Sequence, residues 1–214
     1  MEMQKKDFIN IEEVIASKNP KLLKLLPRFI ISYLKRIVHQ DFVNNFIREN
    51  GHKNSFEFAD AIIHDFGPIV TYSGLENIPE EGGAIVAANH PLGGIDAIAF
   101  IQTVGKKRQD IKFIVNDILL NLKNFEKEFI GVNKHGKNPV STLDLIDQQY
   151  NSNQLVLIFP AGMVSRKQEK GVIKDLEWKK SFVVKAKKFN RPIIPVHITG
   201  MNSNFFYLYC NYFL

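Results

Sequence analysis

The stretch AIVAANHPLGGIDAIAF, residues 84–100, decides the fold. It begins as an apolar run typical of a buried strand, turns through a proline and two glycines at residues 91–94, and continues in an apolar pattern typical of a helix. His90 stands at the end of the expected strand, and Asp96 stands at the start of the expected helix. The sequence therefore predicts a strand–turn–helix unit with a histidine and an aspartate on either side of the turn.

Strand-like runs and helical patterns alternate after this unit and shortly before it. The expected strands are residues 69–75, 83–89, 111–116, 128–134, 154–161 and 191–200. The expected helices between them are residues 94–105, 118–126, 140–151 and 176–189. Near-continuous apolar strands that alternate with helices indicate an α/β domain, in which a largely parallel or mixed sheet is flanked by helices.

The first 66 residues have a different pattern, which predicts helices. Apolar residues recur at three- and four-residue spacing from 22 to 38, and Pro27 is expected to break this run in two. The helices expected next are residues 42–47 and residues 56–66, the second capped by Ser55. We therefore predict an N-terminal amphipathic helical region at residues 1–66 and an α/β domain at residues 67–214.

The charge of the chain favours anionic partners. Its formal net charge is +6, and residues 18–36 contain six Lys or Arg and no Asp or Glu. Nucleic acid, an anionic lipid surface and an acidic carrier protein all fit this charge. No run reaches the roughly 18 apolar residues that a membrane-spanning helix needs. If the protein meets a membrane, we expect the basic and apolar residues 18–38 to bind its surface.

Several classes of site are not indicated by the residues present. The single cysteine, Cys210, excludes an internal disulfide and a cysteine-based zinc site. The histidines and carboxylates lack the spacing of metal ligands, so no metal or other cofactor is expected. Helix-turn-helix, zinc-finger and RNA-binding motifs are absent, which argues against a nucleic-acid partner. The N-terminus does not have the pattern of a signal peptide.

Polar clusters follow three of the expected strands. His90 and Asp96 follow the second strand, residues 133–137 follow the fourth, and residues 159–167 follow the fifth. In α/β sheets chemistry gathers at the carboxyl ends of the strands. A carboxylate that contacts a histidine ring fixes its orientation and leaves the other nitrogen free as a base. No G-x-S-x-G motif is present, which favours direct attack by a substrate hydroxyl over a covalent enzyme intermediate.

Four blocks carry a family resemblance in their order along the chain. They are NHPLGGID (89–96), FIGVNK (129–134), FPAGMVSRK (159–167) and IIPVHITG (193–200). Together they resemble the blocks of the glycerolipid acyltransferase family typified by lysophosphatidic acid acyltransferase. The similarity is greatest to the hemolysin-like branch, which includes O-acyltransferases for lyso-ornithine lipids.

The resemblance implies transfer of a fatty acyl group from acyl-carrier protein or acyl-CoA to the hydroxyl of a lysolipid. By the same resemblance His90 is the base, Asp96 orients it, and Lys134 and Arg166 bind the acceptor head group, with Gly162 allowing close approach. It further implies that the N-terminal helices hold the enzyme peripherally on the cytoplasmic face of the inner membrane, where anionic lipids lie.

The chain departs from the family pattern in places. Five residues separate His90 from Asp96, where the family usually has four, and Ala161 and Met163 stand where a glutamate is usual. The family continues past its fourth block, which leads us to expect a truncated chain or a C-terminal tail packed on membrane or core. These departures keep a second hypothesis open, a non-catalytic lipid-binding or membrane-associated relative. The acceptor, the donor and the acyl-chain length stay undecided by sequence.

Two further expectations concern the core. His197 lies within the expected strand 191–200, and we predict that it is a buried histidine with a hydrogen-bonding partner. Trp178, Phe182, Ala186 and Phe189 recur at helical spacing and are predicted to pack in the core.

Overall fold

The computed structural model describes residues 7–133, 139–204 and 206–208. The chain divides into two compact units, Met1–Lys53 and Asn54–Leu214. Each unit has its own architecture, helical in the first and α/β in the second.

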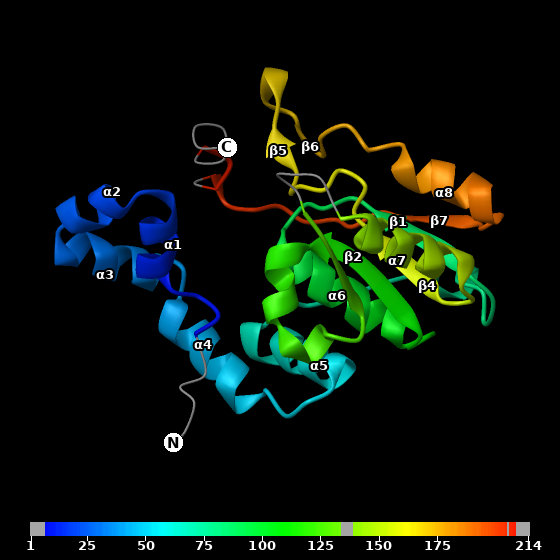
Figure 1. The fold of residues 1–214 in the computed structure, drawn as a ribbon, viewed down its shortest axis with the longest axis horizontal. Helices are drawn as coiled ribbons and strands as arrows, with labels where there is room; N and C mark the ends of the chain where they lie inside the picture. Colours follow the sequence, from blue (N-terminus) through cyan, green and yellow to red (C-terminus); the bar gives the residue numbers. More distant parts are fainter. Residues whose placement is uncertain (1–6, 134–138, 205, 209–214) are drawn as a thin grey trace. The chain divides into compact units, whose positions relative to one another are not determined.

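The first unit is drawn in shades of blue in Figure 1. Its helices are α1 (Ile11–Lys18), α2 (Pro20–Leu25), α3 (Arg28–Ile37) and α4 (Gln40–Glu49). The break predicted at Pro27 is confirmed, because α2 ends before this proline and α3 begins directly after it.

Buried polar side chains of α4 fix the start of α1. Asn44 accepts a hydrogen bond from the backbone N–H of Ile9 over 2.9 Å and donates one to its carbonyl over 2.7 Å. Gln40 accepts from the backbone N–H of Ile11 over 2.9 Å. Both side chains are buried, so these bonds satisfy groups that would otherwise lose their water partners at a cost.

The second unit contains the sheet. Its helices are α5 (Ser55–Phe66), α6 (Gly94–Gly105), α7 (Val140–Asn151) and α8 (Ser181–Phe189). Its strands are β1 (Ala84–Ala88), β2 (Ile111–Asn116), β3 (Phe129–Val132), β4 (Leu155–Ile158), β5 (Arg166–Lys167), β6 (Ile173–Lys174) and β7 (Ile193–Val196). The helix α5 lies inside the predicted N-terminal region at residues 1–66, but it packs on α6 and is part of this second unit.

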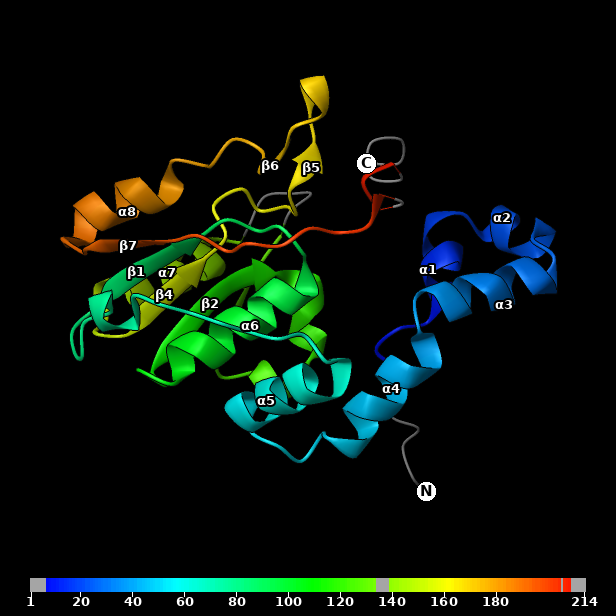
Figure 2. The same cartoon turned by 180° about the vertical axis from the view of Figure 1, so that it is seen from behind.

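Among the described residues, five strands form one sheet in the order β3-β2-β4-β1-β7, and each neighbouring pair is parallel. The predicted α/β class is therefore confirmed. The strands β5 and β6 pair separately, as a short antiparallel hairpin. In Figures 1 and 2 this hairpin, in yellow, extends beyond the end of the sheet.

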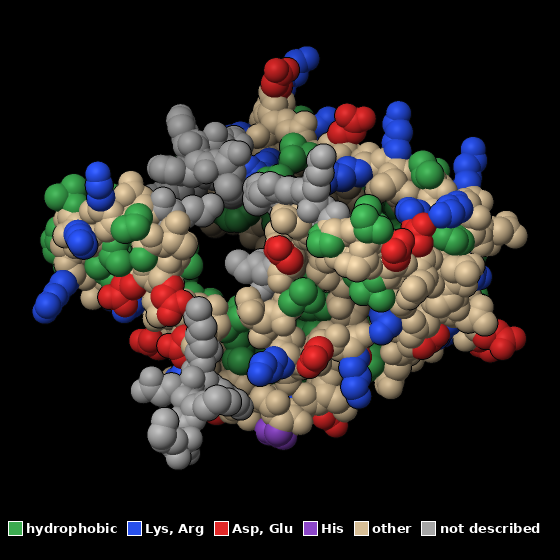
Figure 3. All heavy atoms as spheres, in the orientation of Figure 1, with side chains coloured by type: hydrophobic (Ala, Val, Ile, Leu, Met, Phe, Trp, Pro, Cys, Tyr) green, Lys and Arg blue, Asp and Glu red, His purple; other side chains and the backbone are tan. Residues whose placement is uncertain are grey.

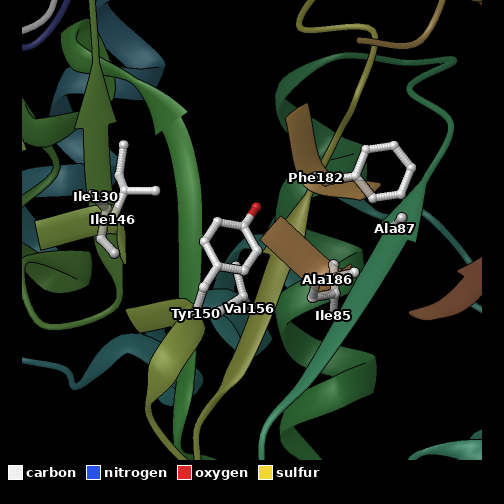
Figure 4. Packing of buried hydrophobic residues seen from close by; sticks show 8 residues of the cluster. All are labelled: Ile85, Ala87, Ile130, Ile146, Tyr150, Val156, Phe182 and Ala186. Atoms are coloured by element: carbon white, nitrogen blue, oxygen red, sulfur yellow. The ribbon is translucent and has the colours of Figure 1, made fainter. Parts of the chain in front are cut away.

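Helices cover both faces of the sheet, and the strand register shows which residues point to each face. Ile85 and Ala87 of β1 pack in one cluster with Tyr150 of α7 and Phe182 of α8, as Figure 4 shows. The alternate residues of the strands point to the opposite face, where Phe113 of β2 lies edge-on to a phenylalanine of α6. Burial on both faces explains why β1 is apolar at every position.

The face toward α6 carries a row of aromatic rings. Phe113 contacts Phe129 of β3, which stacks on Phe125, and Phe125 in turn meets Phe58 of α5. Three of these rings (Phe58, Phe113 and Phe125) are completely buried. Burial of each contributes on the order of 1.5–3 kcal/mol to folding.

Two predicted elements are wrong. The expected strand at residues 69–75 does not form, because residues 69–74 pair with no strand and a 3₁₀ turn begins at Leu75, and Ile69 is 93% exposed. The expected helix at residues 118–126 is instead two short 3₁₀ turns, Asp117–Asn121 and Lys123–Phe125.

Two details of single residues also differ from the predictions. Asn54, not Ser55, caps α5, and its capping box with Glu57 satisfies the first N–H groups of the helix. His197 is exposed rather than buried, because β7 is an edge strand that ends at Val196. The predicted core packing of Phe182 and Ala186 is confirmed, and Trp178 and Phe189 are partly buried against the same cluster.

Candidate active site

Parallel pairing places the loops of the candidate site together. The strand β1 lies between β4 and β7, and all three run in the same direction. Their carboxyl ends therefore meet at one edge of the sheet, which brings the segment after Ala88 beside the segment after Ile158. These two segments carry the first and third sequence blocks.

His90 and Asp96 contact each other across the turn. His90 Nδ1 lies 3.0 Å from Asp96 Oδ2, and the Asp96 side chain is fully buried, whereas the His90 side chain is 16% exposed. The same Asp96 oxygen accepts the backbone N–H groups of Leu92 over 2.7 Å and Gly93 over 3.0 Å. A carboxylate facing Nδ1 favours the tautomer with the proton on Nδ1, and Nε2 then keeps its lone pair.

Gly93 makes this geometry accessible. Its φ of 92° and ψ of −131° lie in a region that is essentially restricted to glycine. This conformation lets the chain reverse sharply after His90, so that Asp96 in the first turn of α6 faces back toward the imidazole. The start of a helix also favours the negative charge of Asp96.

Phe159 holds the His90 ring from one face. The two rings are stacked, with centroids 4.0 Å apart and an angle of 15° between their planes. Phe159 itself packs on Phe100 of α6 and Phe113 of β2. The ring plane of His90 is therefore fixed by the aromatic core, while its Nδ1 is fixed by Asp96. Sequence reasoning missed this residue, although it begins the third block.

The segment after Phe159 crosses the turn that carries His90. Gly162 adopts a φ of 65° and donates its N–H to the Phe159 carbonyl over 2.9 Å, which makes a turn. Ser165 then donates its N–H to the His90 carbonyl over 2.7 Å. Arg166, the next residue, starts β5 and is partly buried. The structure thus places Arg166 one residue from a direct contact with His90.

Lys134, which we predicted to bind substrate, lies outside the described residues. The preceding strand β3 ends at Val132. Because the sheet is parallel, its carboxyl end lies on the same side of the sheet as the carboxyl end of β1. Because β2 and β4 lie between them, β3 is about 14 Å from β1 at the usual strand spacing.

Asparagines that sequence reasoning missed fix the loops around His90. Asn89 exchanges two hydrogen bonds with the backbone of Ile198, at 2.8 and 2.6 Å. Asn202 donates to the carbonyl of Pro91 over 2.9 Å, and its own N–H donates to the hydroxyl of Tyr207 over 3.0 Å. No local pattern marks these residues, since their partners are up to 111 positions away.

Within residues 7–133, 139–204 and 206–208, no group of three or more His, Cys, Asp or Glu side chains could hold a metal ion. In the same part of the chain, no helix is long and apolar enough to cross a membrane.

Comparison with known proteins identifies the family. Residues 13–212 match the family described as Acyltransferase. The chain is 39% identical over 205 residues to the lyso-glycine lipid O-acyltransferase of Bacteroides thetaiotaomicron, covering 95% of this chain and 75% of that protein. It is 40% identical over 205 residues to the protein of the same name from Phocaeicola vulgatus, covering 95% and 73%. These matches extend over nearly all of the chain and confirm the resemblance of the four blocks, so the protein belongs to the glycerolipid acyltransferase family and is an acyltransferase.

Proposed function

We propose that this acyltransferase moves a fatty acyl group from a thioester to the hydroxyl of a lysolipid, with His90 as the general base. The observation that carries the proposal is the contact of 3.0 Å between His90 Nδ1 and the buried Asp96 carboxylate. Such a pair leaves Nε2 able to accept the proton of a hydroxyl group.

The reaction follows from this geometry in two steps. Nε2 of His90 takes the hydroxyl proton while the lysolipid oxygen attacks the thioester carbonyl. The tetrahedral intermediate then collapses, the C–S bond breaks, and the imidazolium returns the proton to the departing sulfur. The products are an ester and a free thiol, so the histidine ends in its starting state.

Asp96 suits the role of stabilising the imidazolium. Its Oδ1 atom is buried and has no hydrogen-bond partner among the described residues, while Oδ2 faces three donors. A buried carboxylate that is incompletely compensated gains from a positive charge beside it. The imidazolium formed during proton transfer supplies that charge, and general-base catalysis of this kind contributes about 10²- to 10⁴-fold to the rate.

For the acceptor, we propose a lysolipid with an anionic head group, and a lyso-glycine lipid in the first place. The two relatives named for that acceptor match 95% of this chain, and the matches cover about three quarters of each relative. Arg166 supports the proposal, because a guanidinium binds a carboxylate or a phosphate through two parallel hydrogen bonds. Lysophosphatidic acid fits the same chemistry and is the competing acceptor.

The acyl donor is proposed to be acyl-carrier protein or acyl-CoA. Both present the acyl group as a thioester, and the net charge of +6 suits either anionic carrier.

Attachment to a membrane surface is proposed for the first unit. Leu25, Phe29 and Tyr33 of α2 and α3 are 80%, 70% and 61% exposed. Lys21, Lys24 and Arg28 belong to the same two helices, and no acid occurs in these helices. Figure 3 shows apolar and basic side chains side by side on this unit. An exposed face that is both apolar and basic is typical of helices that lie on anionic membranes.

The experiment that tests the proposed function is an acyl-transfer assay with a matrix of substrates. Purified protein is given acyl-carrier protein or CoA carrying a labelled acyl chain, with lyso-glycine lipid, lyso-ornithine lipid or lysophosphatidic acid. We expect an acylated lyso-glycine lipid as the main product. Thioester hydrolysis without any lipid product would refute O-acyl transfer, and a product from lysophosphatidic acid alone would refute the proposed acceptor.

A further inference from the structure

We infer that Asp175, which lies outside the four sequence blocks, is a positioning residue that sets His90 relative to the β5–β6 hairpin. The inference rests on the proposed role of His90 as the base. Asp175 follows β6 directly and is partly buried. Its carboxylate receives hydrogen bonds from three residues, His90, Ser165 and Trp178.

Both carboxylate oxygens of Asp175 are used. Oδ1 accepts the backbone N–H of His90 over 3.1 Å and also the hydroxyl of Ser165. Oδ2 accepts the indole N–H of Trp178 over 2.9 Å. The backbone carbonyl of Asp175 accepts from the side chain of Gln168, on the other side of the hairpin, over 2.9 Å. A carboxylate is needed here, because an amide has only one accepting oxygen.

The bonds to His90 form a closed ring. The His90 carbonyl accepts from the Ser165 N–H, the Ser165 hydroxyl donates to Asp175, and Asp175 accepts from the His90 N–H. Both backbone polar groups of the proposed base are thus bound to residues that flank the hairpin. Because Arg166 is the first residue of that hairpin, the ring also determines the offset between the base and the proposed head-group ligand.

Trp178 connects this ring to the protein core. Its indole packs against the buried cluster of α7 and α8, and it lies edge-on to Phe182 with centroids 6.1 Å apart. The hydrogen bond from Nε1 therefore fixes the Asp175 carboxylate to a rigid part of the fold. Asp175 does not touch the reacting atoms in this account. It acts through the backbone of His90, which sets where the ring lies against Asp96 and Phe159.

The first test is the Asp175→Ala variant, assayed beside wild type with the substrates of the proposed function. Displacing a catalytic group by about 1 Å can cost about 100-fold in rate, so we expect kcat to fall by about 10- to 100-fold. The KM for the acceptor should change by less than about threefold, because Arg166 is retained. The matched control is Glu177→Ala, which removes an exposed carboxylate two positions away and should leave kcat unchanged.

A rescue experiment separates positioning from general loss of stability. In Asp175→Asn the side-chain oxygen can accept the bonds from His90 and Ser165, but the NH₂ group then faces the indole N–H of Trp178. Two donors would oppose each other there. Trp178→Phe removes the second donor and lets the asparagine oxygen serve His90 and Ser165. We therefore expect the double variant to have a higher kcat than Asp175→Asn alone. A double variant that is no faster than Asp175→Asn would overturn the inference.

A measurement without turnover tests the positioning of His90 separately from the proposed function. The ¹⁵N and ¹H resonances of the His90 ring report the proton on Nδ1 and its bond to Asp96. We expect this signal in wild type and in Glu177→Ala, and its shift or loss in folded Asp175→Ala. If wild type transfers no acyl group, the proposed function fails, but this signal still tests the positioning. An unchanged signal in Asp175→Ala, or an unchanged kcat, would contradict it.

Discussion

Ser165 donates its backbone N–H to the carbonyl oxygen of His90 over 2.7 Å, and so joins the segment that follows β4 to the segment that follows β1. Residues 75 positions apart in sequence are thereby adjacent at the edge of the sheet. The parallel pairing of β1 and β4 is the cause, because it brings both strand ends to the same place. In the proposed mechanism this junction holds the proposed base, His90, beside the proposed head-group residue, Arg166.

Gly93 is a backbone position of the junction at which a side chain is strained. In Gly93→Ala the new Cβ would lie 3.4 Å from Val164, and the backbone would occupy a region that residues with side chains avoid. We expect urea titration to show that the free energy of unfolding of Gly93→Ala is lower than that of wild type by about 1–3 kcal/mol. Gly67→Ala is the matched control, since its positive φ ends α5 with no atom within 4 Å of the new Cβ. Equal losses in the two variants would contradict the special role of Gly93.

Phe159→Leu tests the stacking on His90. Leucine keeps an apolar side chain against Phe100 and Phe113 but lacks a flat ring to hold the imidazole plane. Aromatic stacking contributes about 0.5–1.5 kcal/mol, so we expect kcat to fall by about three- to tenfold. Phe66→Leu, at a 42% exposed ring at the end of α5, is the comparison and should keep its activity. A Phe159→Leu enzyme as fast as wild type would show that the stacking has no catalytic effect.

Asp147 gives a pH dependence of stability that is remote from the site. Hydrogen bonds from Lys185 and Lys188 hold the pKa of this carboxyl below its ordinary value of 3.8, against the opposing effect of burial. When folding lowers the pKa of a carboxyl, the charged carboxylate stabilises the folded protein at pH values above its pKa in the unfolded chain. This stabilisation is lost as the pH falls through the pKa of the folded protein.

The variant Asp147→Asn should therefore be less stable than wild type at pH 6, and the difference should shrink below about pH 4. Because the carboxylate is 27% exposed, the difference at pH 6 should be only about 0.5–1 kcal/mol. Urea titrations of both proteins at pH 6, 4 and 3 measure it. A difference that grows as the pH falls would have the wrong sign for this account.

The proposed membrane face predicts a specific binding defect. Replacing Leu25 and Phe29 by serine removes two of its largest exposed apolar side chains, so binding to phosphatidylglycerol vesicles should weaken by about tenfold or more. Wild-type binding should also decrease in high salt, because the lysines and Arg28 contribute through charge. Val14→Ser, at an exposed apolar residue of α1, is the control. Binding is measured as the fraction of protein that sediments with the vesicles. If this fraction is the same in the double variant and in wild type, the membrane contact lies elsewhere.

The sequence predicts structure well where the residues that determine an element lie next to one another in the chain. The unit from Ala84 to Gly105 was predicted in type and order, because the apolar run, the glycine turn and the helix start are adjacent. The helix α7 was predicted with its observed bounds for the same reason. By contrast, residues 69–75 have the composition of a strand but no neighbouring strand, and pairing cannot be inferred from a single segment.

The site was predicted only in part, for a related reason. The contact of His90 with Asp96 spans six positions, and a local pattern can indicate it. Asp175 contacts His90 from 85 positions away, and its partners are backbone groups that every residue possesses. No local pattern marks Phe159, because its stacking on His90 depends on the register of β1 and β4.

The central claim is tested most directly by acyl transfer in His90→Ala, measured beside His64→Ala. His64 also contacts an aspartate, Asp65, over 2.7 Å, but the pair is exposed on α5 and far from the strand ends in sequence. We predict that His90→Ala loses at least about 100-fold in kcat while remaining folded, and that His64→Ala transfers the acyl group at the wild-type rate. A folded His90→Ala protein that transfers as fast as wild type would contradict the assignment of His90 as the base.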